Sequence, residues 1–221
     1  MIVVVDYGAA NLLSITRALE AAGASVEVSA DPERIRAAQA VVLPGVGAAG
    51  AAMNALRASG VDAALRATIA SERPLLGVCL GMQLLFERLE EGDCLGLSVL
   101  AGSVTRLRSA PKVPHIGWNS LEWDPTLLAP LARTVFAGVP PGWQAYFVHS
   151  YACAPDNPSD AVAWTDYGGP ICAAACRGAT LGVQFHPEKS GRAGVGLLGA
   201  WVAWALTSTP RETPSEVAAH D

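Results

Sequence analysis

Charged residues are scarce in this 221-residue chain, where Asp, Glu, Lys and Arg make up 16% of the sequence against 51% hydrophobic residues. A chain with so few charges and so many apolar side chains folds into a globular structure rather than remaining disordered. Basic residues are fewer than acidic ones: the chain has 15 Lys and Arg and 20 Asp and Glu, so its formal net charge is −5. That balance argues against a surface for nucleic acid or for an anionic membrane.

A long hydrophobic run is also missing. The longest apolar stretch, residues 193–206, is shorter than the roughly 20 residues that a membrane span needs. Residues 2–5 are apolar, but Asp6 ends this run and no basic residue flanks it, so it does not have the pattern of a signal peptide. We therefore expect a cytoplasmic protein.

Metal-binding motifs and disulfide frameworks are absent as well. The five cysteines are odd in number, and none forms a C-x-x-C motif with a nearby histidine. We expect neither a metal nor a cofactor. Four of the cysteines are interpreted as reduced core or surface thiols: Cys94, Cys153, Cys172 and Cys176.

The first half of the chain alternates between strand-like and helix-like segments, which implies parallel strands, right-handed crossovers and helices on both faces of a sheet. The second half is rich in strands, and residues 167–169 and 177–178 are typical of hairpin turns. The sequence therefore predicts an α/β fold with a doubly wound, mostly parallel sheet and an antiparallel strand addition. It contains no internal repeat and no low-complexity block.

The boundaries of the expected elements follow from apolar runs, caps and glycine stops. Strands are expected at residues 2–6, 25–29, 40–43, 75–78, 103–107, 144–148, 161–164, 171–175 and 179–185. Helices are expected from a cap at Asn11 to Glu20, after Asp31 and Pro32, at 51–69 with a break near Gly60, at 82–89 and at 193–206. Residues 1–207 would form one domain, and residues 208–221, with two prolines and several charges, a mobile C-terminal tail.

Cys79 is the cysteine with a distinctive setting. Residues 77–83 read GVCLGMQ, so Cys79 lies between a buried strand and the helix expected at 82–89, with a glycine two residues away on each side. This is the G-x-S-x-G nucleophile elbow with sulfur in place of oxygen. The N-terminus of the following helix would favour the thiolate through its dipole and its free N–H groups.

A base and its orienting carboxylate are expected at residues 185–188, which read FHPE. His186 follows an apolar strand, and Pro187 favours an extended conformation there and opposes the start of a helix. In an extended segment Glu188 points the same way as His186, so its carboxylate could accept the Nδ1–H of the imidazole and set its tautomer. Cys79, His186 and Glu188 thus form a candidate triad.

The Cys79 motif and the His186 motif each have a commoner explanation when taken alone. A cysteine at a strand end is usually a core residue, and a lone histidine is usually a hydrogen-bonded structural residue. Both motifs, however, fall at the carboxyl ends of predicted strands, where open α/β sheets form their sites. The combination therefore favours catalysis.

The motifs at 77–83 and 185–188 resemble the signatures of the class-I, triad glutamine amidotransferases. Residues 6–12 (DYGAANL), 114–119 (PHIGWN) and 146–151 (YFVHSY), with Lys189 and Ser190, narrow this resemblance to the glutaminase subunits of imidazole glycerol phosphate synthases, enzymes of histidine biosynthesis. The resemblance runs from residue 2 to about residue 206, with one departure at Ala10, where the family usually has glycine.

The resemblance implies a flavodoxin-like fold for the amidotransferase domain and hydrolysis of L-glutamine to glutamate and ammonia through a Cys79 thioester. It also implies a heterodimer in which a (β/α)₈-barrel cyclase subunit receives the ammonia and makes imidazole glycerol phosphate and an aminoimidazole carboxamide ribotide. No cofactor is implied for this chain.

Acyl transfer needs preorganised donors for an oxyanion. The N–H of Leu80 is one candidate, because it follows the nucleophile, and the backbone of Gly45, Val46 and Gly47 is the other. An ordinary strand-to-helix turn also favours glycine, but the resemblance identifies this segment with the family's oxyanion segment. It also implies a peptide that can rotate, so that the hole forms only with an activator and the isolated chain is slow.

Gln83 lies one helical turn beyond Cys79 and faces the same way, so its amide could bind the α-amino or carboxylate end of glutamine. The plainer interpretation is a glutamine hydrogen-bonded to a loop. By resemblance, His149, Ser150 and Tyr151 match a segment whose backbone holds the glutamine carboxylate. The side chain of His149 has no further role that the residues indicate, and a structural one is expected.

Candidate partner contacts lie in the loops on the same rim. A tryptophan in the irregular, proline-bounded segment 114–119 would most simply fill the core, and most lysines at the position of Lys189 are only solvated. The resemblance implies instead that Lys189 pairs with an acidic residue of the cyclase near the ammonia entrance. The residues assigned to the partner interface are Asn11, Ile116, Trp118, Tyr146 and Lys189.

Two other functions are open to such a chain. One is a glutaminase that serves a different synthase, such as anthranilate or GMP synthase, against which the segments at 114–119 and 146–151 argue. The other is a non-catalytic, flavodoxin-like binding or regulatory module. A degenerate module should have lost at least one member of the triad, and this sequence retains all three.

Overall fold

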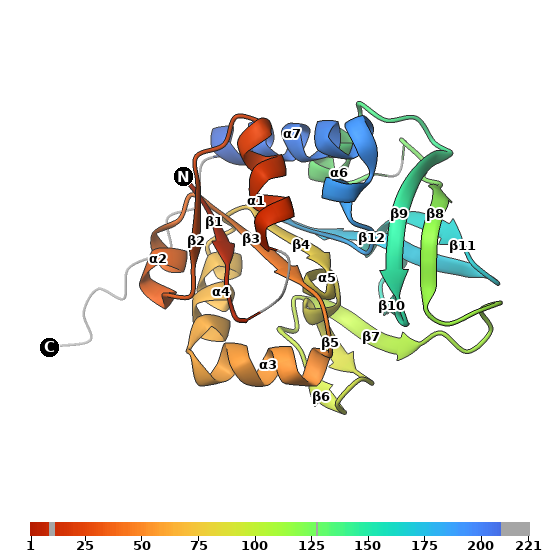
Figure 1. Ribbon diagram of the computed structural model, residues 1–221, viewed down its shortest axis with the longest axis horizontal. Helices are drawn as coiled ribbons and strands as arrows, with labels where there is room; N and C mark the ends of the chain where they lie inside the picture. The colour runs from red at the N-terminus through yellow and green to blue at the C-terminus, as the bar shows by residue number, and fades with distance from the viewer. Residues whose placement is uncertain (9–11, 127, 209–221) are drawn as a thin grey trace, which may run out of the picture.

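The computed structural model describes residues 1–8, 12–126 and 128–208 (Figure 1). Three expectations therefore fall outside the described residues: the helix cap at Asn11, the partner contact assigned to Asn11, and all but the first residue of the tail predicted at 208–221. Within the described ranges, no helix combines the length and the apolar character needed to cross a membrane.

The strands and helices alternate through the first half of the chain, as predicted. The strands are β1 Ile2–Val5, β2 Val26–Ser29, β3 Ala40–Gly45, β4 Leu75–Cys79, β5 Phe86–Leu89, β6 Cys94–Leu95, β7 Leu100–Arg106, β8 His115–Leu121, β9 Trp143–His149, β10 Tyr151–Pro155, β11 Ala161–Asp166, β12 Pro170–Arg177 and β13 Thr180–Val183. The helices are α1 Leu12–Ala21, α2 Pro32–Ala37, α3 Ala49–Ala58, α4 Val61–Ala70, α5 Leu80–Leu84, α6 Pro130–Phe136 and α7 Gly191–Thr207, with single 3₁₀ turns η1 Pro158–Asp160 and η2 Pro187–Lys189.

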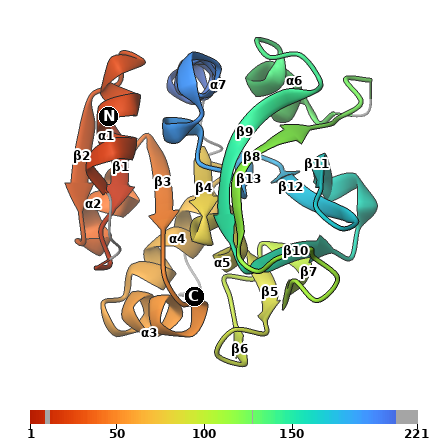
Figure 2. The ribbon, with the colours of Figure 1, turned by 45° about the vertical axis from the view of Figure 1, so that its right-hand side comes forward.

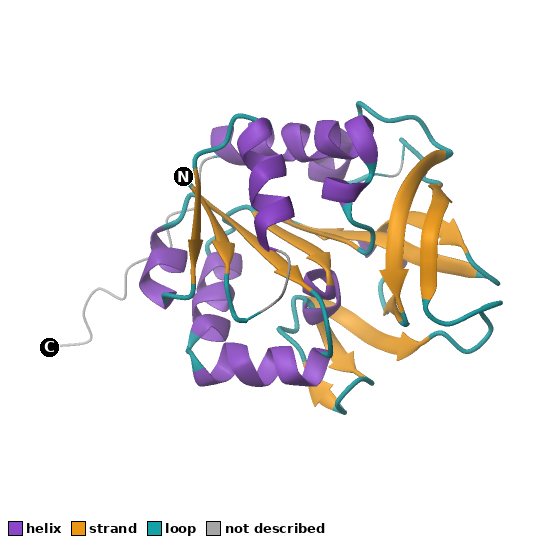
Figure 3. Cartoon of the chain, in the orientation of Figure 1, coloured by secondary structure: helices purple, strands orange, loops and turns teal. Residues whose placement is uncertain are grey.

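The main sheet has the strand order β2-β1-β3-β4-β13-β12-β10-β7-β5-β6, with β11 paired to β12. The five strands from β2 to β13 pair in parallel, whereas β12 pairs antiparallel with β13, β10 and β11. Strands β8 and β9 form a separate antiparallel ribbon that arches over the strand-rich end of the molecule, with α6 beside its upper end (Figures 2 and 3). The predicted fold class, mostly parallel with an antiparallel addition, is confirmed.

Two hydrophobic cores lie on opposite faces of the parallel sheet, because successive side chains of a strand point to opposite sides. Ile2 and Val4 of β1 pack in the core that includes α1, α6 and α7, while Val3 and Val5 pack in the core that includes α2, α3 and α4. Figure 1 shows the same division, with α1 and α7 above the sheet and α3 and α4 below it. The sheet is therefore doubly wound.

The helix predicted at residues 82–89 is wrong in its second half. Helix α5 ends at Leu84, and residues 86–89 form β5, which pairs in parallel with β7 and antiparallel with β6. Phe86 and Leu89 are buried in the core around α3 and α4. Pairing with strands distant in sequence overrides the helical propensity of this segment.

The segment at residues 114–119 was expected to be irregular and is instead regular. Strand β8 pairs with β9 along all seven residues, from His115 opposite His149 to Leu121 opposite Trp143. Pro114 precedes the first paired residue, so it removes no hydrogen bond from the ladder. The expectation missed this strand because its apolar alternation is short, over Ile116 and Trp118, and these two side chains face outward instead of forming a buried face.

Candidate active site

The turn between β4 and α5 holds Cys79 in a strained conformation. Its φ is 55° and its ψ is −107°, a region that residues other than glycine rarely adopt. A Cβ at Gly81 would collide with the carbonyl oxygen of Leu43, and a Cβ at Gly77 would lie 2.8 Å from the backbone of Gly81. Both glycines are therefore required for the close packing of α5 on the sheet, and the predicted elbow is confirmed.

Helix α5 begins directly after the sulfur, at Leu80, and is only five residues long. The first N–H groups of a helix have no acceptor within the helix, so the N–H of Leu80 is available at the start of α5. Leu80 borders the same pocket as Cys79, together with Val46 and Gly47. Gly45 does not: it pairs with Cys79 within the β3–β4 ladder and borders a separate cavity of about 10 Å³ that His186 and Glu188 also line.

His186 is positioned by its backbone and by Glu188. Its N–H donates to the carbonyl of Tyr146 at 2.9 Å, and its Nδ1 lies 2.8 Å from Oε1 of Glu188. The two side chains are 3% and 4% exposed. The predicted pair is formed, but not through an extended segment: residues 187–189 make a 3₁₀ turn that starts at Pro187, because proline is well tolerated at the first position of a helix.

The charge state of His186 differs from that of an ordinary buried histidine. Burial lowers its pKa, but the interactions with Cys79 and with Glu188 raise it more, to about 9. The imidazole is therefore protonated at neutral pH, and its Nε2 has no hydrogen-bond partner among the described residues. This arrangement leaves a buried imidazolium at the pocket that Cys79 also lines, with an Nε2 that is unpaired within the described part of the chain.

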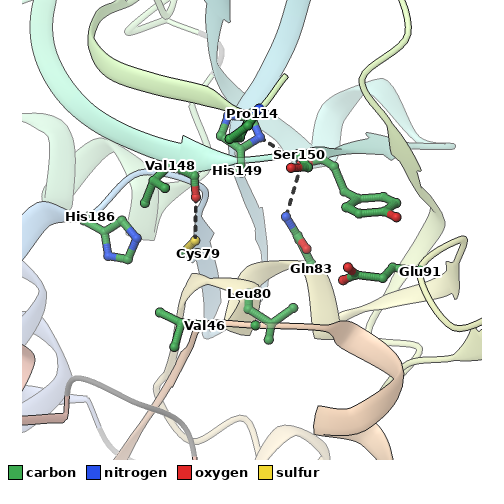
Figure 4. A pocket seen from close by; sticks show the side chains of 12 residues that line it. Val46, Cys79, Leu80, Gln83, Glu91, Pro114, Val148, His149, Ser150 and His186 are labelled. Carbon is green, nitrogen blue, oxygen red and sulfur yellow. Dashed lines mark hydrogen bonds between the residues drawn. The ribbon is translucent and has the colours of Figure 1, made fainter. Parts of the chain in front are cut away.

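A pocket of about 270 Å³ opens in front of Cys79, close to the lower end of the 300–1,000 Å³ typical of small-molecule sites. The close-up in Figure 4 shows its walls, which come from the ends of β3 and β4, from α5, from the turn after β5 and from the β9–β10 segment. The lining residues are Val46, Gly47, Cys79, Leu80, Gln83, Glu91, Pro114, Val148, His149, Ser150, Tyr151 and His186.

Gln83 lines this pocket, as predicted, and its amide nitrogen is already engaged. Nε2 donates to the carbonyl of Tyr151 at 3.1 Å and to Oε1 of Gln184 at 3.0 Å. Only its oxygen remains to accept a bond from a ligand. His149 also borders the pocket, but its ring nitrogens contact the Tyr151 carbonyl and His115.

Glu91 borders the pocket and was missed by the sequence analysis. It lies in the turn between β5 and β6, two residues beyond the helix that was predicted at 82–89. Its Oε2 accepts a hydrogen bond from the N–H of Ala49 at 2.8 Å, at the start of α3. No motif or spacing in the sequence points to this residue, because only tertiary packing brings the turn to the pocket.

Three of the residues expected at a partner interface, Ile116, Trp118 and Tyr146, lie together on the β8–β9 ribbon. Ile116 and Trp118 are 59% and 56% exposed, and Trp118 stands opposite Tyr146 with ring centroids 6.0 Å apart. Lys189 is exposed as well. The alternative that Trp118 fills the core is therefore wrong.

Comparison with known sequences and structures gives one consistent result. Residues 3–197 match the family model for class-I glutamine amidotransferases. The chain is 47% identical over 210 residues to the imidazole glycerol phosphate synthase subunit HisH of Herpetosiphon aurantiacus, covering 94% of this chain and 96% of that one. It is 46% identical over 213 residues to the subunit of the same name from Chloroflexus aurantiacus, covering 96% and 99%.

The fold has a counterpart among solved structures. A crystal structure of a glutamine amidotransferase superposes with a TM-score of 0.71, covering 92% of this chain and 98% of that one at 18% identity. At so low an identity the likeness concerns the fold alone.

The Glu188→Gln variant is expected to have a lower His186 pKa than the native value of about 9, because the amide carries no charge while burial still disfavours the imidazolium. A histidine pKa raised above the unfolded value of about 6.5 stabilises the fold fully below pH 6.5, and this contribution is lost as the pH rises through 9. The stability difference between native chain and variant should therefore shrink between these pH values.

An NMR titration of the His186 ring and denaturant unfolding at several pH values measure these two effects. Glu91→Gln is the matched control, because its carboxylate borders the same pocket without bonding His186. A native midpoint near 6.5, or a stability difference that does not change with pH, would contradict the assignment.

Proposed function

The chain belongs to the class-I glutamine amidotransferase family, and from its site geometry we propose how it releases ammonia from glutamine. Its function is that of the glutaminase subunit of imidazole glycerol phosphate synthase, in histidine biosynthesis. One observation carries the assignment of the catalytic residues: the buried imidazole of His186, held by Glu188 and protonated at neutral pH, shares a pocket with Cys79 at its strained elbow.

The proposed reaction begins with attack of the Cys79 thiolate on the side-chain amide carbon of glutamine. A carbon–sulfur bond forms, and the carbonyl electrons move to the oxygen, which is stabilised by the N–H of Leu80 and by the backbone of Val46 and Gly47. As the carbonyl reforms, the carbon–nitrogen bond breaks and His186 gives its proton to the departing nitrogen. Water, deprotonated by His186, then attacks the thioester carbon, and the carbon–sulfur bond breaks. Glutamate leaves, its new carboxyl group loses a proton to solvent, and the Cys79 thiolate and the His186 imidazolium are restored.

The other walls of the pocket suggest how the amino-acid end of glutamine is held. Glu91 is the only carboxylate among the residues that line it, so it is the candidate for binding the α-ammonium group, together with the free oxygen of Gln83. The backbone of Ser150 and Tyr151 is the candidate for the α-carboxylate. Gly45 borders the small cavity beside His186 and Glu188 instead of the pocket, so we assign it to supporting the oxyanion segment.

The partner is the cyclase subunit, and we infer that it is a (β/α)₈ barrel that docks on the apolar face of β8 and β9. Ile116, Trp118 and Tyr146 supply large apolar surface, and Lys189 supplies a cation next to the catalytic Glu188. Aromatic side chains exposed to this extent are typical of interface anchors. Docking there would set ammonia free close to the receiving subunit and could turn the oxyanion peptide at Val46 and Gly47.

The two rival functions are less consistent with these findings. A glutaminase for another synthase would not be expected to show 46–47% identity to HisH subunits over more than nine-tenths of the chain. A non-catalytic module would have no reason to retain the strain at Cys79 and the buried pair of His186 and Glu188.

Glutamate release should be slow for the isolated chain and should rise by orders of magnitude when the cyclase subunit and its nucleotide substrate are added. Cys79→Ala should lower the stimulated rate by at least about 10³-fold, because the nucleophile is lost. Cys94→Ala, which removes a half-buried thiol outside the pocket, should retain it.

Each arm of this experiment can fail separately. Turnover that survives in Cys79→Ala would overturn the triad. Fast turnover by the isolated chain that does not respond to the cyclase subunit would leave the triad intact and overturn the activation.

Glu91→Gln should raise the KM for glutamine about 10-fold or more and change kcat less, because hydrogen bonds to charged groups contribute roughly 1.5–3 kcal/mol. The amide oxygen can still accept from Ala49, so the start of α3 is preserved. Steady-state kinetics of the stimulated complex measure the effect, with Glu90→Gln as the control, since Glu90 bonds Arg106 and Arg108 outside the pocket. An unchanged KM would exclude Glu91 as the ammonium ligand.

Trp118→Ala should weaken binding of the cyclase subunit by about 10-fold or more, as expected for an aromatic anchor worth over 1 kcal/mol. Titration calorimetry measures the Kd. Trp164→Ala is the control, because Trp164 is 37% exposed on β11, outside the face formed by β8 and β9. Equal Kd values for the two variants would place the interface elsewhere.

A further inference from the structure

Two buried histidines next to the pocket take no part in the mechanism above. His115 and His149 are 2% and 5% exposed and stand opposite each other on β8 and β9. Nδ1 of His115 lies 3.0 Å from Nε2 of His149, and Nδ1 of His149 lies 2.8 Å from the carbonyl oxygen of Tyr151. The ring of His115 is stacked between Phe147 and Tyr167, with centroids 4.8 and 3.8 Å away.

Both rings are neutral at physiological pH, because burial lowers the pKa of each to about 4. For His149 the hydrogen bond to the Tyr151 carbonyl opposes this shift, and the charges of His115 and His186 add to it. A neutral imidazole has one N–H and one acceptor nitrogen. Each ring can therefore donate one hydrogen bond and accept one.

The acceptors determine the direction of the whole chain of hydrogen bonds. A carbonyl can only accept, so the proton of His149 is on Nδ1 and its Nε2 is the acceptor. His115 must then donate from its own Nδ1, which leaves its Nε2 as the acceptor that faces Nδ2 of Asn119 at 3.4 Å. Asn119 also donates to the carbonyl of Asp166 at 2.8 Å, which fixes the orientation of its amide.

The last acceptor of this chain belongs to the glutamine pocket. The carbonyl of Tyr151 receives the Nδ1–H of His149 and the Nε2–H of Gln83, so both of its lone pairs are occupied. The second N–H of Gln83 goes to Gln184, whose own amide nitrogen lies 3.8 Å from the sulfur of Cys79. His149 thus holds the Tyr151 carbonyl, and this carbonyl in turn holds the amide nitrogen of Gln83 and so fixes where the Gln83 oxygen points.

We propose that His115 and His149 are positioning residues, which hold the Tyr151 carbonyl and, through it, the Gln83 amide in the orientation that binds glutamine. The proposal rests on the function proposed above, because it assigns Gln83 and the 150–151 backbone to the substrate. Neither histidine touches the reacting atoms. Their loss should therefore weaken glutamine binding rather than slow the chemical step.

Two variants of His149 separate this role from mere packing. The amide nitrogen of Asn can occupy the place of Nδ1 and still donate to Tyr151, whereas that of Gln reaches only the place of Nε2. His149→Gln should raise the KM for glutamine about 3- to 10-fold, as expected for one hydrogen bond, with kcat changed less than about twofold. His149→Asn should remain within about twofold of the native KM.

The comparison is made with the stimulated complex of the chain and its cyclase subunit. Equal KM values for the two variants, or a loss confined to kcat in His149→Gln, would overturn the proposal.

An independent readout does not depend on activity. Nitrogen-15 NMR of the histidine rings in Cys79→Ala protein should show both His115 and His149 with the proton on Nδ1, the tautomer that is less common in free histidine. A proton on Nε2 of either ring at neutral pH would break the order of donors and overturn the proposal.

Failure of this proposal is distinguishable from failure of the proposed function. If Cys79→Ala retains its turnover, the proposed function fails. The nitrogen-15 NMR measurement of the two tautomers still tests the proposal about the histidine pair. If Cys79→Ala is inactive but His149→Gln and His149→Asn bind glutamine equally well, the proposal about the histidines alone is wrong.

Discussion

The parallel pairing of β3, β4 and β13 is the constraint on which the site depends. Its register sets Gly45 beside Cys79 and Val183 beside Val78, so the carboxyl ends of three strands meet at one edge of the sheet. The proposed nucleophile Cys79, the proposed oxyanion segment at Val46 and Gly47, and the proposed base His186 follow these ends over short turns. The proposed chemistry, which depends on accurate positioning of the reacting groups, is thus placed on paired strands of the central sheet.

Burial alone does not decide the charge of a histidine here. His186 and His149 are buried to a similar extent, yet the pKa of the first is raised to about 9 and that of the second is lowered to about 4. The difference lies in the partners: a carboxylate and a thiol surround His186, whereas His149 meets a carbonyl and a neutral ring. One ring can then move protons, and the other can only fix a geometry.

Much of the fold and of the catalytic centre could be predicted because the signals are local. Glycines on both sides of Cys79, the cap at Asp31 and the hairpin glycines act within a few residues. Strand β5 and strand β8 were not recognised, since pairing partners distant in sequence determine them. Glu91 was missed for the same reason: a carboxylate in an ordinary turn has no signature until the turn packs against α3.

The sequence by itself determined the α/β class, through the alternation of strands and helices along the first half of the chain. It also determined the tight turn at Cys79 and the pairing of His186 with Glu188, because each of these rests on spacing within one short segment. Only the tertiary structure decided which way side chains face between segments. On the same strand, Trp118 faces the surface and His115 faces inward. The amide nitrogen of Gln83 donates to the Tyr151 carbonyl and to Gln184. Such choices depend on contacts between strands far apart in the chain, which no local pattern encodes.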